Sequence, residues 1–517
     1  MQQRNVRRGV ISQNYSIPAP TGGLNVKDSM DNMPPEDAFV MDNYIPLDNK
    51  VVLRKGYQLH FKTEQAVGTL MSYKISGRNK LLAACGGDIY DITSKENIIR
   101  YEKSFSDNHW QYCQFKNRLI MVNGSDSPQI YYIDSDNNAH LETLSMSGEN
   151  LILSKLINVS VSKQRLFFVE KGSLNTWYTS GVGEVQGTLN KFDLSTIFRD
   201  GGELISVACW TQDGGQGIDD LTVFLSSEGE VAIYSGSNPN SAESWTLKGV
   251  YRMSRPIGYR CVIPYQGDIV IISEDGYIPL SKALPLNQTN SSLIAFSDKI
   301  RGLVLDRTVS NKTKFGWQGL IYNRGGYALF NVPVGQNYEQ HIINTNTGAW
   351  CRFTDIPSIC WGEYNGRIYF GSDTGVYLFD EGYSDNGMPI CGQVEQAYNN
   401  LGSPHLKRIQ LLNPRTKSST KYALVIYTNM DFATQNRSYV ENIGSYGITK
   451  WSTAKWSHPS APTGTKWSTL KGSIRSQWIA NSATGFKASI VFKTKTRGNL
   501  IEWFDTGVRY ENGSGIF

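Results

Sequence analysis

The sequence predicts an all-β protein, built as a β-propeller of about seven blades followed by a C-terminal antiparallel β-sandwich. Pairs of short β-branched and aromatic segments recur at intervals the size of a propeller blade, and the pattern changes from Pro389 onward. The composition agrees, because only 19% of the 517 residues are charged while Gly occurs 49 times and Tyr 28 times. Such a composition disfavours a helical protein. A chain of this length with 40% hydrophobic residues can bury a large core.

Residues 1–56 are expected to form an extended N-terminal arm, because they contain few alternating segments. Arg4, Arg7 and Arg8 make the first eight residues basic, with no acidic residue among them, and are a candidate basic arm. No apolar segment follows them, as a secretory signal would require. The protein is therefore expected to stay where it is made, or to leave by lysis.

Residues 57–388 carry the repeat that predicts the propeller. In each repeat a short apolar segment is followed by a polar turn, usually with Gly or Asn, and then by a second short segment, which is the pattern of a β-hairpin. The expected pairs are 81–85 with 89–92, 119–122 with 130–133, 166–169 with 177–178, 222–225 with 231–234, 269–272 with 277–278, 327–330 with 341–343, and 368–370 with 376–379. Blades of ~40–50 residues stack around an axis because one blade alone cannot bury both of its faces.

The blade count depends on the period alone. The first segments of the pairs start 38, 47, 56, 47, 58 and 41 residues apart, and no WD40 or kelch consensus appears. Because the intervals are uneven, six and eight blades are alternatives to seven. A sandwich built from unrelated β-hairpins is the alternative to a propeller.

Residues 389–517 are predicted to form the β-sandwich, because their alternating segments are longer, as in 421–428 and 486–495. Trp451, Trp456 and Trp467 lie in a stretch rich in Ser, Thr, Lys and Pro rather than in a continuous strand pattern. Two interpretations are open. The indoles either pin a long loop onto the sandwich or anchor a partner protein, since Trp is favoured at the buried centres of interfaces.

The C-terminal region is also distinctly basic. Residues 389–517 contain 16 Lys and Arg against six acidic residues, a net charge of +10, whereas the whole chain carries +5 and residues 1–388 therefore carry −5. Lys493, Lys495 and Arg497 alternate along one expected strand, so they are predicted to share a face. This patch is either a solvated basic surface or a docking site for an acidic protein ring or DNA.

A search for catalytic motifs predicts a protein that is not an enzyme. The sequence contains no GxxxxGK[ST] phosphate loop, no HExxH zinc helix and no GxSxG nucleophile elbow, and its six histidines are dispersed. No catalytic residue, cofactor or metal site is expected. The seven cysteines include no CxxC pair and lie mostly in hydrophobic segments, so reduced, buried thiols are expected. No apolar run approaches the ~20 residues of a membrane-spanning helix.

Two acidic segments resemble functional sites and are interpreted as loops. Residues 134–138, Asp-Ser-Asp-Asn-Asn, resemble the start of a calcium loop, but Ala139 stands where that loop needs Gly and Ser145 stands where it needs a bidentate Glu. A hairpin turn is therefore expected. Asp219 and Asp220 could form a carboxylate pair for glycoside hydrolysis, but neighbouring strand residues point to opposite faces, so solvent-exposed loop charges are expected.

Several short motifs resemble structural proteins of tailed bacteriophages. They are Gly-Gly-Leu-Asn at 22–25, Asp-Asn-Tyr-Ile-Pro at 42–46, Val-Leu-Arg-Lys-Gly-Tyr at 52–57, Ala-Tyr-Asn-Asn-Leu-Gly-Ser at 397–403 and Asn-Met-Asp-Phe at 429–432. The layout is most similar to the tail hub or nozzle proteins of short-tailed phages, which include the packaged-DNA stabilisation proteins.

The resemblance implies a structural role in a phage tail. It implies a homo-oligomeric, hexameric ring below the portal and adaptor, which extends the DNA-exit channel, retains packaged DNA until a terminal plug leaves, and attaches tail fibres or spikes. Genomic DNA would pass through the lumen without sequence-specific binding. The protein would be made in the host cytoplasm and end in the virion tail. A receptor- or glycan-binding propeller of the tail is the first alternative, and a propeller glycan hydrolase is the second.

Overall fold

The chain divides into two compact units. The computed structural model describes residues 12–173, 176–213, 218–241, 243–265, 267–283, 295–419, 422–435, 437 and 473–513. Leu59–His341 and Asp355–Phe379 form one unit, here called the propeller unit. Met1–Gln58, Ile342–Thr354 and Asp380–Phe517 form the other, here called the sheet unit.

The first half of the propeller unit consists of antiparallel sheets whose strands follow one another in the chain. The first holds β7 (Val67–Tyr73), β8 (Lys80–Cys85), β9 (Asp88–Asp91) and β10 (Ile99–Tyr101). The second holds β11 (Gln111–Phe115), β12 (Arg118–Val122), β13 (Gln129–Ile133) and β14 (Ala139–Thr143). The third holds β16 (Leu156–Ser162), β17 (Arg165–Glu170), β18 (Thr176–Thr179) and β19 (Gly187–Asp193), with β15 (Met146–Gly148) parallel to β19.

The second half continues the series. β20 (Leu204–Asp213), β21 (Ile218–Ser226), β22 (Glu230–Gly236) and β23 (Trp245–Arg252) form one sheet, and β24 (Val262–Tyr265), β25 (Asp268–Ser273) and β26 (Gly276–Pro279) form the next. The helices α1 (Leu280–Ala283) and α3 (Arg301–Asn311) follow, with the short 3-10 turns Leu153–Lys155 and Asp298–Ile300 elsewhere. β27 (Gln318–Tyr322), β28 (Tyr327–Val334) and β29 (Asn337–Asn344) are neighbours, and β29 leads the chain out of the unit.

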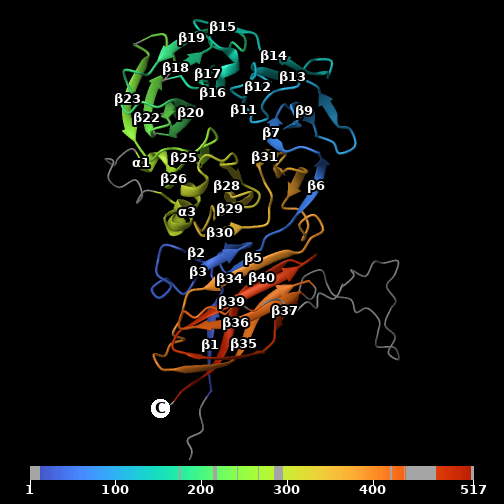
Figure 1. Ribbon diagram of the computed structural model, residues 1–517, viewed down its shortest axis with the longest axis vertical. Helices are drawn as coiled ribbons and strands as arrows, with labels where there is room; N and C mark the ends of the chain where they lie inside the picture. Colours follow the sequence, from blue (N-terminus) through green and yellow to red (C-terminus); the bar gives the residue numbers. More distant parts are fainter. Residues whose placement is uncertain are drawn as a thin grey trace, which may run out of the picture. The chain divides into compact units, whose positions relative to one another are not determined.

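The last sheet of the propeller unit is completed by a strand from the other end of the chain. β31 (Cys360–Tyr364), β32 (Arg367–Gly371) and β33 (Gly375–Phe379) continue into β6 (Tyr57–Lys62), which pairs with β33. β31 lies beside β7, so the sheets form a closed ring (Figure 1). Together these observations confirm the predicted all-β chain with a β-propeller.

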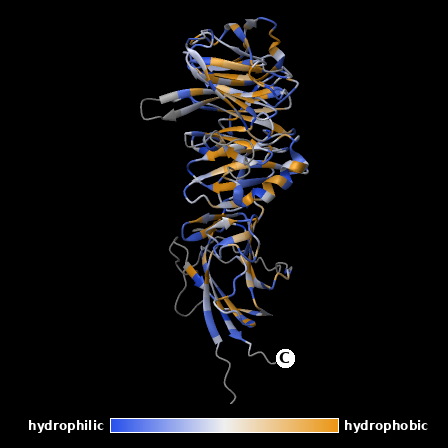
Figure 2. Ribbon diagram, turned by 90° about the vertical axis from the view of Figure 1, so that its left-hand side faces the viewer, coloured by the Kyte–Doolittle hydropathy of each residue, from blue (hydrophilic) through white to orange (hydrophobic). Residues whose placement is uncertain are grey.

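Neighbouring sheets share their hydrophobic cores, which explains why the ring is stable. Met71, Leu82 and Ala84 of the β7–β10 sheet pack with Leu119 and Met121 of the next sheet. The same sharing joins the β7–β10 sheet to the last sheet, through a cluster containing Val67, Leu81, Ala83, Cys360, Tyr369 and Val376. Apolar residues therefore occupy the strands of successive sheets (Figure 2), because each sheet is covered on both faces.

The sheet unit contains two sheets drawn from both ends of the chain. One holds β1 (Ser12–Pro18), β4 (Tyr44–Leu47), β5 (Lys50–Leu53), β35 (Lys407–Ser418), β37 (Ser473–Ser476), β38 (Ile479–Gly485) and β40 (Ile501–Asn512). The other holds β2 (Gly23–Leu24), β3 (Asp37–Asp42), β30 (Trp350–Phe353), β34 (Ile390–Gln396), β36 (Ala423–Met430) and β39 (Ala488–Thr496). Residues 12–53, expected as an extended arm, thus contribute β1 to β5.

Side chains of these two sheets meet in one core. The ring of Phe492 on β39 stacks on Trp503 of β40 with centroids 4.2 Å apart, and its centroid lies 5.9 Å from that of Tyr44 on β4. The Tyr44 hydroxyl lies 2.7 Å from Thr494 Oγ1. Strand β1 joins this unit through backbone pairing with β40 from Ser12 to Pro18. Most of its side chains are exposed, so its sequence shows no alternating apolar pattern.

Candidate functional site

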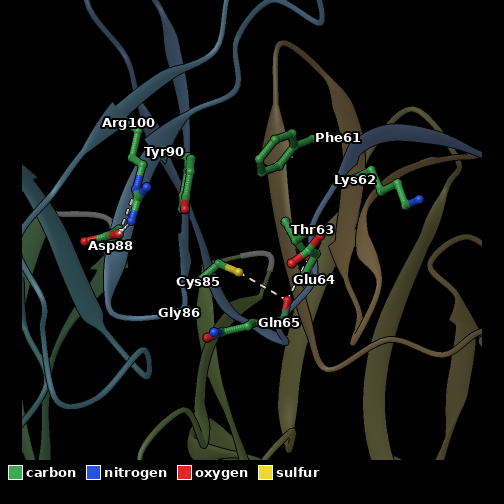
Figure 3. A pocket seen from close by; sticks show the side chains of 10 residues that line it. All are labelled: Phe61, Lys62, Thr63, Glu64, Gln65, Cys85, Gly86, Asp88, Tyr90 and Arg100. Carbon is green, nitrogen blue, oxygen red and sulfur yellow. Dashed lines mark hydrogen bonds and ion pairs between the residues drawn. The ribbon is translucent and has the colours of Figure 1, made fainter.

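A crevice in the propeller unit lies where β6 approaches the β7–β10 sheet (Figure 3). Its volume is about 340 Å³. The lining residues are Phe61, Lys62, Thr63, Glu64, Gln65, Cys85, Gly86, Asp88, Tyr90 and Arg100. Because β6 comes from residues 57–62 and completes the last sheet, ring closure itself creates this crevice.

Two aromatic rings of the crevice pack against each other. The centroids of Phe61 and Tyr90 are 5.5 Å apart and their planes are inclined by 44°. Phe61 comes from β6 and Tyr90 from β9, and Figure 3 shows the two rings at the upper part of the crevice. Such rings offer flat apolar faces, while Lys62, Glu64 and Arg100 supply charge at the rim.

One wall of the crevice is fixed by an ion pair. Arg100 donates from Nε and Nη2 to Asp88 Oδ2 at 2.9 and 2.7 Å, while Asp88 Oδ1 accepts the backbone N–H groups of Lys103 and Ser104. Burial alone would raise the pKa of Asp88, but these hydrogen bonds and the Arg100 charge together lower it below its ordinary value of 3.8. Asp88 therefore stays ionised at neutral pH and does not act as a proton donor.

The cysteine in the crevice is a poor nucleophile. Cys85 Sγ donates to the carbonyl oxygen of Gln65 at 3.1 Å, and burial raises the pKa of its thiol. The thiolate is the reactive form of cysteine, so a raised pKa suppresses reactivity. Gly86 adopts φ +60, and a Cβ there would lie 2.7 Å from Gln65 Oε1, so this turn favours glycine.

The structure supports a shared face for part of the predicted basic patch. Lys493 and Lys495 are half-buried, whereas Phe492, Thr494 and Thr496 between and beside them are buried. Arg497 is exposed and follows the end of β39. Among the residues described, no carboxylate lies within ion-pair distance of these three cations. Their role in partner contact stays a prediction.

The other predicted contact residues lie outside the described residues. They are Trp451, Trp456 and Trp467 of the C-terminal region and Arg4, Arg7 and Arg8 of the N-terminus. Two further Trp residues of the C-terminal region are described. Trp503 is fully buried, whereas Trp478 is 40% exposed and lies under the guanidinium of Arg509, 5.1 Å from the ring centroid.

The structure shows a buried charge cluster in the sheet unit that the sequence analysis did not identify. The Arg54 side chain is 0% exposed and donates from Nη1 and Nη2 to the two carboxylate oxygens of Asp385 at 2.8 and 2.7 Å. Its Nε donates to Asn43 Oδ1 at 2.8 Å, and its Nη2 to the Thr354 carbonyl at 3.2 Å. The cluster thereby joins three separate segments of this unit.

The cluster explains two of the phage-like motifs in physical terms. Asn43 and Arg54 belong to the motifs at 42–46 and 52–57. Asn43 adopts φ 63, and its Nδ2 donates to the Cys391 carbonyl at 2.7 Å. In this chain both residues maintain the fold. One feature of the sequence could have indicated the cluster. Arg54 directly follows the apolar residues 51–53, and a charged residue in such a buried segment usually needs a partner of opposite charge.

The acidic segments behave in different ways. Residues 134–138 form the expected hairpin turn between β13 and β14, with Asn138 N donating to Asp134 Oδ1 at 2.7 Å. Asp220 lies on β21 rather than in a loop. Its carboxylate accepts a hydrogen bond from Thr211 Oγ1 at 2.9 Å and lies 3.7 Å from Lys163 Nζ. The expectation of a loop at Asp220 was therefore wrong, because β21 extends back to Ile218 and pairs with β20. The side chain of Asp219 lies outside the described residues.

The remaining predicted chemistry concerns thiols, metals and membranes. All seven cysteines are free thiols, with Cys85, Cys261, Cys351 and Cys360 buried and the other three half-buried. Within the described ranges, no cluster of three or more His, Cys, Asp or Glu side chains could hold a metal ion. No helix in that part of the chain is long and apolar enough to span a membrane.

Comparison with known proteins adds little beyond the fold. No protein-family model and no curated protein matches the sequence. BBS1N in complex with ARL6DN is similar at 9% sequence identity with a TM-score of 0.38, and the match covers 64% of this chain and 99% of that one. A putative 6-phosphogluconolactonase from Bacteroides fragilis is similar at 12% identity with a TM-score of 0.35, and the match covers 65% of this chain and 91% of that one. The WD40 β-propeller domain of Doa1 is similar at 12% identity with a TM-score of 0.35, and the match covers 62% of this chain and 96% of that one. At these TM-scores the similarity carries no argument about what this chain does.

Proposed function

We propose that this chain is a non-enzymatic structural protein of a short phage tail. It forms a homo-oligomeric hub or nozzle, expected to be a hexamer, that extends the DNA-exit channel below the portal and adaptor, retains packaged DNA and attaches fibres or spikes. The phage-like motifs at 22–25, 42–46 and 52–57 support the proposal. The finer architecture belongs to it as well, with seven blades, the β27–β29 group being one of them, and a β-sandwich made by the two sheets of the sheet unit.

The observation that carries the proposal is the basic patch of Lys493, Lys495 and Arg497. Several other cations of the sheet unit are neutralised within the chain, as in Arg54 with Asp385, Lys50 with Glu502 and Arg415 with Asp505. The patch has no such carboxylate among the residues described. Positive charges left unpaired on one strand raise the rate of association with an acidic surface. An adaptor ring of negative potential would provide that surface.

Assembly with the adaptor is the experiment that tests this function. Purified protein is mixed with phage heads that carry the adaptor but lack the tail, and the product is examined by electron microscopy and by mass measurement. A ring of six subunits adds about 347 kDa, because one chain has a mass of 57.9 kDa. A ring below the adaptor supports the proposal. Failure to bind adaptor-bearing heads at any ionic strength would contradict it.

A receptor- or glycan-binding propeller is the second candidate, and the crevice of Figure 3 favours it. Paired aromatic rings beside charged and amide groups provide the stacking faces and hydrogen bonds that sugars need. A glycan array tests this candidate directly. Binding that is lost in Phe61→Ala and Tyr90→Ala but kept in Phe432→Ala, an exposed aromatic outside the crevice, would favour it over the hub.

A further inference from the structure

A second cavity lies among the innermost strands of the propeller unit. Its volume is about 350 Å³, within the range of ~300–1,000 Å³ typical of small-molecule sites. The wall is formed by β7, β11, β16, β20, β24 and β27, each of which is the end strand of its group. The cavity is therefore axial, because the end strands of successive sheets surround the centre of the ring. We call it the axial cavity.

Arg260 places a positive charge in this cavity. It precedes β24 and reaches the strands at the start of the propeller, where its Nη2 donates to Thr69 Oγ1 at 2.6 Å and to the Trp110 carbonyl at 2.9 Å. Its Cζ lies 4.9 Å from the centroid of Phe315, a cation–π contact. These contacts hold the guanidinium in place. All of the hydrogen-bond acceptors are neutral, so the charge itself is not compensated by them.

The charge of Arg260 has no acidic partner in the part of the chain that the structure describes. Asp107, the acidic side chain nearest in electrostatic effect, accepts a hydrogen bond from the backbone N–H of His109, and its Oδ1 lies 2.8 Å from His109 Nδ1. Burial lowers the pKa of Arg260, which is half-buried and lines the cavity. The Arg260 Nε–H also donates to nothing among the described residues.

Other polar groups of the cavity are placed to receive a ligand. Tyr112 of β11 is 37% exposed although it lies among the innermost strands, so its hydroxyl can donate a hydrogen bond into the cavity. Ser160 of β16 also lies in the wall, but its Oγ is buried and does not open onto the cavity. Gln111 adds an amide to the wall. The apolar remainder includes Val161, Ala208 and Val262.

We propose that the axial cavity binds a small molecule bearing an oxyanion, a carboxylate or a phosphate, of about monosaccharide size, with Arg260 as its charged anchor. The guanidinium matches either anion. Tyr112 donates a hydrogen bond to the polar remainder of the ligand. The proposal is independent of the tail-hub function, because it requires only the propeller unit of a single chain. A sugar acid and a free phosphate are the two sources that the experiment separates.

Calorimetry and thermal unfolding of the full chain test the proposal. The probes are glucuronate, inorganic phosphate and, as an uncharged control, glucose. The wild-type chain is expected to bind one of the two anions with a Kd of ~1 mM or lower and to show a Tm that rises with its concentration. Binding of glucuronate alone identifies a sugar acid, and binding of phosphate identifies the phosphate source. Binding of neither anion, or equal binding of glucose, overturns the proposal.

Matched substitutions locate the site. Arg260→Gln keeps a donor for Thr69 but removes the charge, so affinity should fall at least ~10-fold, the equivalent of one charge-assisted hydrogen bond. Arg255→Gln is the control, since Arg255 lies on the same segment, is 58% exposed and pairs with Glu228. Affinity should stay within about twofold of wild type there. Unchanged affinity in Arg260→Gln overturns the assignment.

A second variant covers the case in which Arg260→Gln does not fold. Ala208→Met on β20 extends a side chain from the cavity wall and leaves Arg260 untouched. It should weaken anion binding by occupying part of the space, while the Tm without ligand measures any loss of folding. An anion that binds Ala208→Met as tightly as wild type occupies another site, which contradicts the proposal.

Discussion

At the scale of single residues, the fold depends on a few charges placed where water cannot reach. Arg54 and Asp385 form a two-pronged pair whose side chains are 0% and 6% exposed, and Asn43 and Thr354 accept further hydrogen bonds from the guanidinium. The pair connects segments far apart in the sequence. Removing one member leaves the other charge buried and unpaired, which is a larger penalty than the pair itself is worth.

Asp385→Asn is therefore expected to destabilise the sheet unit strongly. The uncompensated Arg54 charge should lower the free energy of unfolding by ~3–5 kcal/mol, measured by chemical denaturation. Asp380→Asn is the matched control in the same segment, because Asp380 pairs at 3.4 Å with Lys55, whose side chain is 40% exposed. That substitution should cost less than ~1 kcal/mol. Equal effects of the two substitutions would show that burial of the Arg54 pair is not decisive.

The Asp88–Arg100 pair predicts a dependence of stability on pH. The folded-state pKa of Asp88 lies below 3.8, so its contribution is present at neutral pH and is lost as the pH falls below 3.8 and through the folded-state pKa. Asp88→Asn should be less stable than wild type at neutral pH, and the difference should narrow over that acidic range. Urea unfolding at a series of pH values measures it. A difference that stays constant with pH would contradict the role assigned to the ionised carboxylate.

At the scale of elements, the position of a strand within its sheet decided whether the sequence pattern predicted it. Every pair of segments expected in residues 57–388 corresponds to two neighbouring strands, such as β8 with β9, β17 with β18 and β32 with β33. These strands are apolar on both faces, and all six residues of β17 are buried. The end strands were missed. β11 borders the axial cavity and β23 is largely exposed, so neither carries a continuous apolar pattern.

The basic patch predicts how the sheet unit meets its partner. Reversing Lys493, Lys495 and Arg497 to Glu should slow association with adaptor-bearing heads at low salt. In the wild type, raising salt from about 50 to 500 mM should slow it too, since the Debye length falls from ~14 to ~4 Å. The Tm should change little, because none of the three cations is buried and none forms an ion pair among the described residues, so each is expected to contribute no more than ~1 kcal/mol. Light scattering follows the association rate.

The control variant changes the net charge by the same amount, but at residues outside the basic patch. Lys103, Lys116 and Lys191 are exposed residues of the propeller unit, and reversing all three to Glu alters the total charge equally. Association of this variant should remain close to the wild-type rate. If both triple variants slow equally, net charge rather than the patch governs docking. If the patch variant assembles normally at low salt, electrostatic docking through β39 is wrong.

At the scale of the whole molecule, stability is expected to come from packing alone. Neighbouring propeller sheets share apolar clusters, and no metal-binding group of three side chains occurs within the described ranges. Incubation with a chelator such as EDTA should therefore leave the Tm unchanged, as measured by calorimetry, because that part of the chain offers no ligand cluster through which a metal could stabilise the fold. A fall of several degrees that added metal reverses would reveal a site that this arrangement of residues does not provide.

The sequence by itself determined the all-β class, the propeller and the hairpin at 134–138, because buried β-branched segments and polar turns are local signals. Only the tertiary structure decided which distant segments join. The sequence could not place β1 against β40, close the ring with β6, set Arg54 against Asp385, or bring Arg260 to Thr69. These contacts depend on backbone pairing and on charges more than a hundred residues apart in the chain. Such contacts produce no periodic pattern in the sequence, because any edge strand or polar partner of suitable geometry can form the same hydrogen bonds.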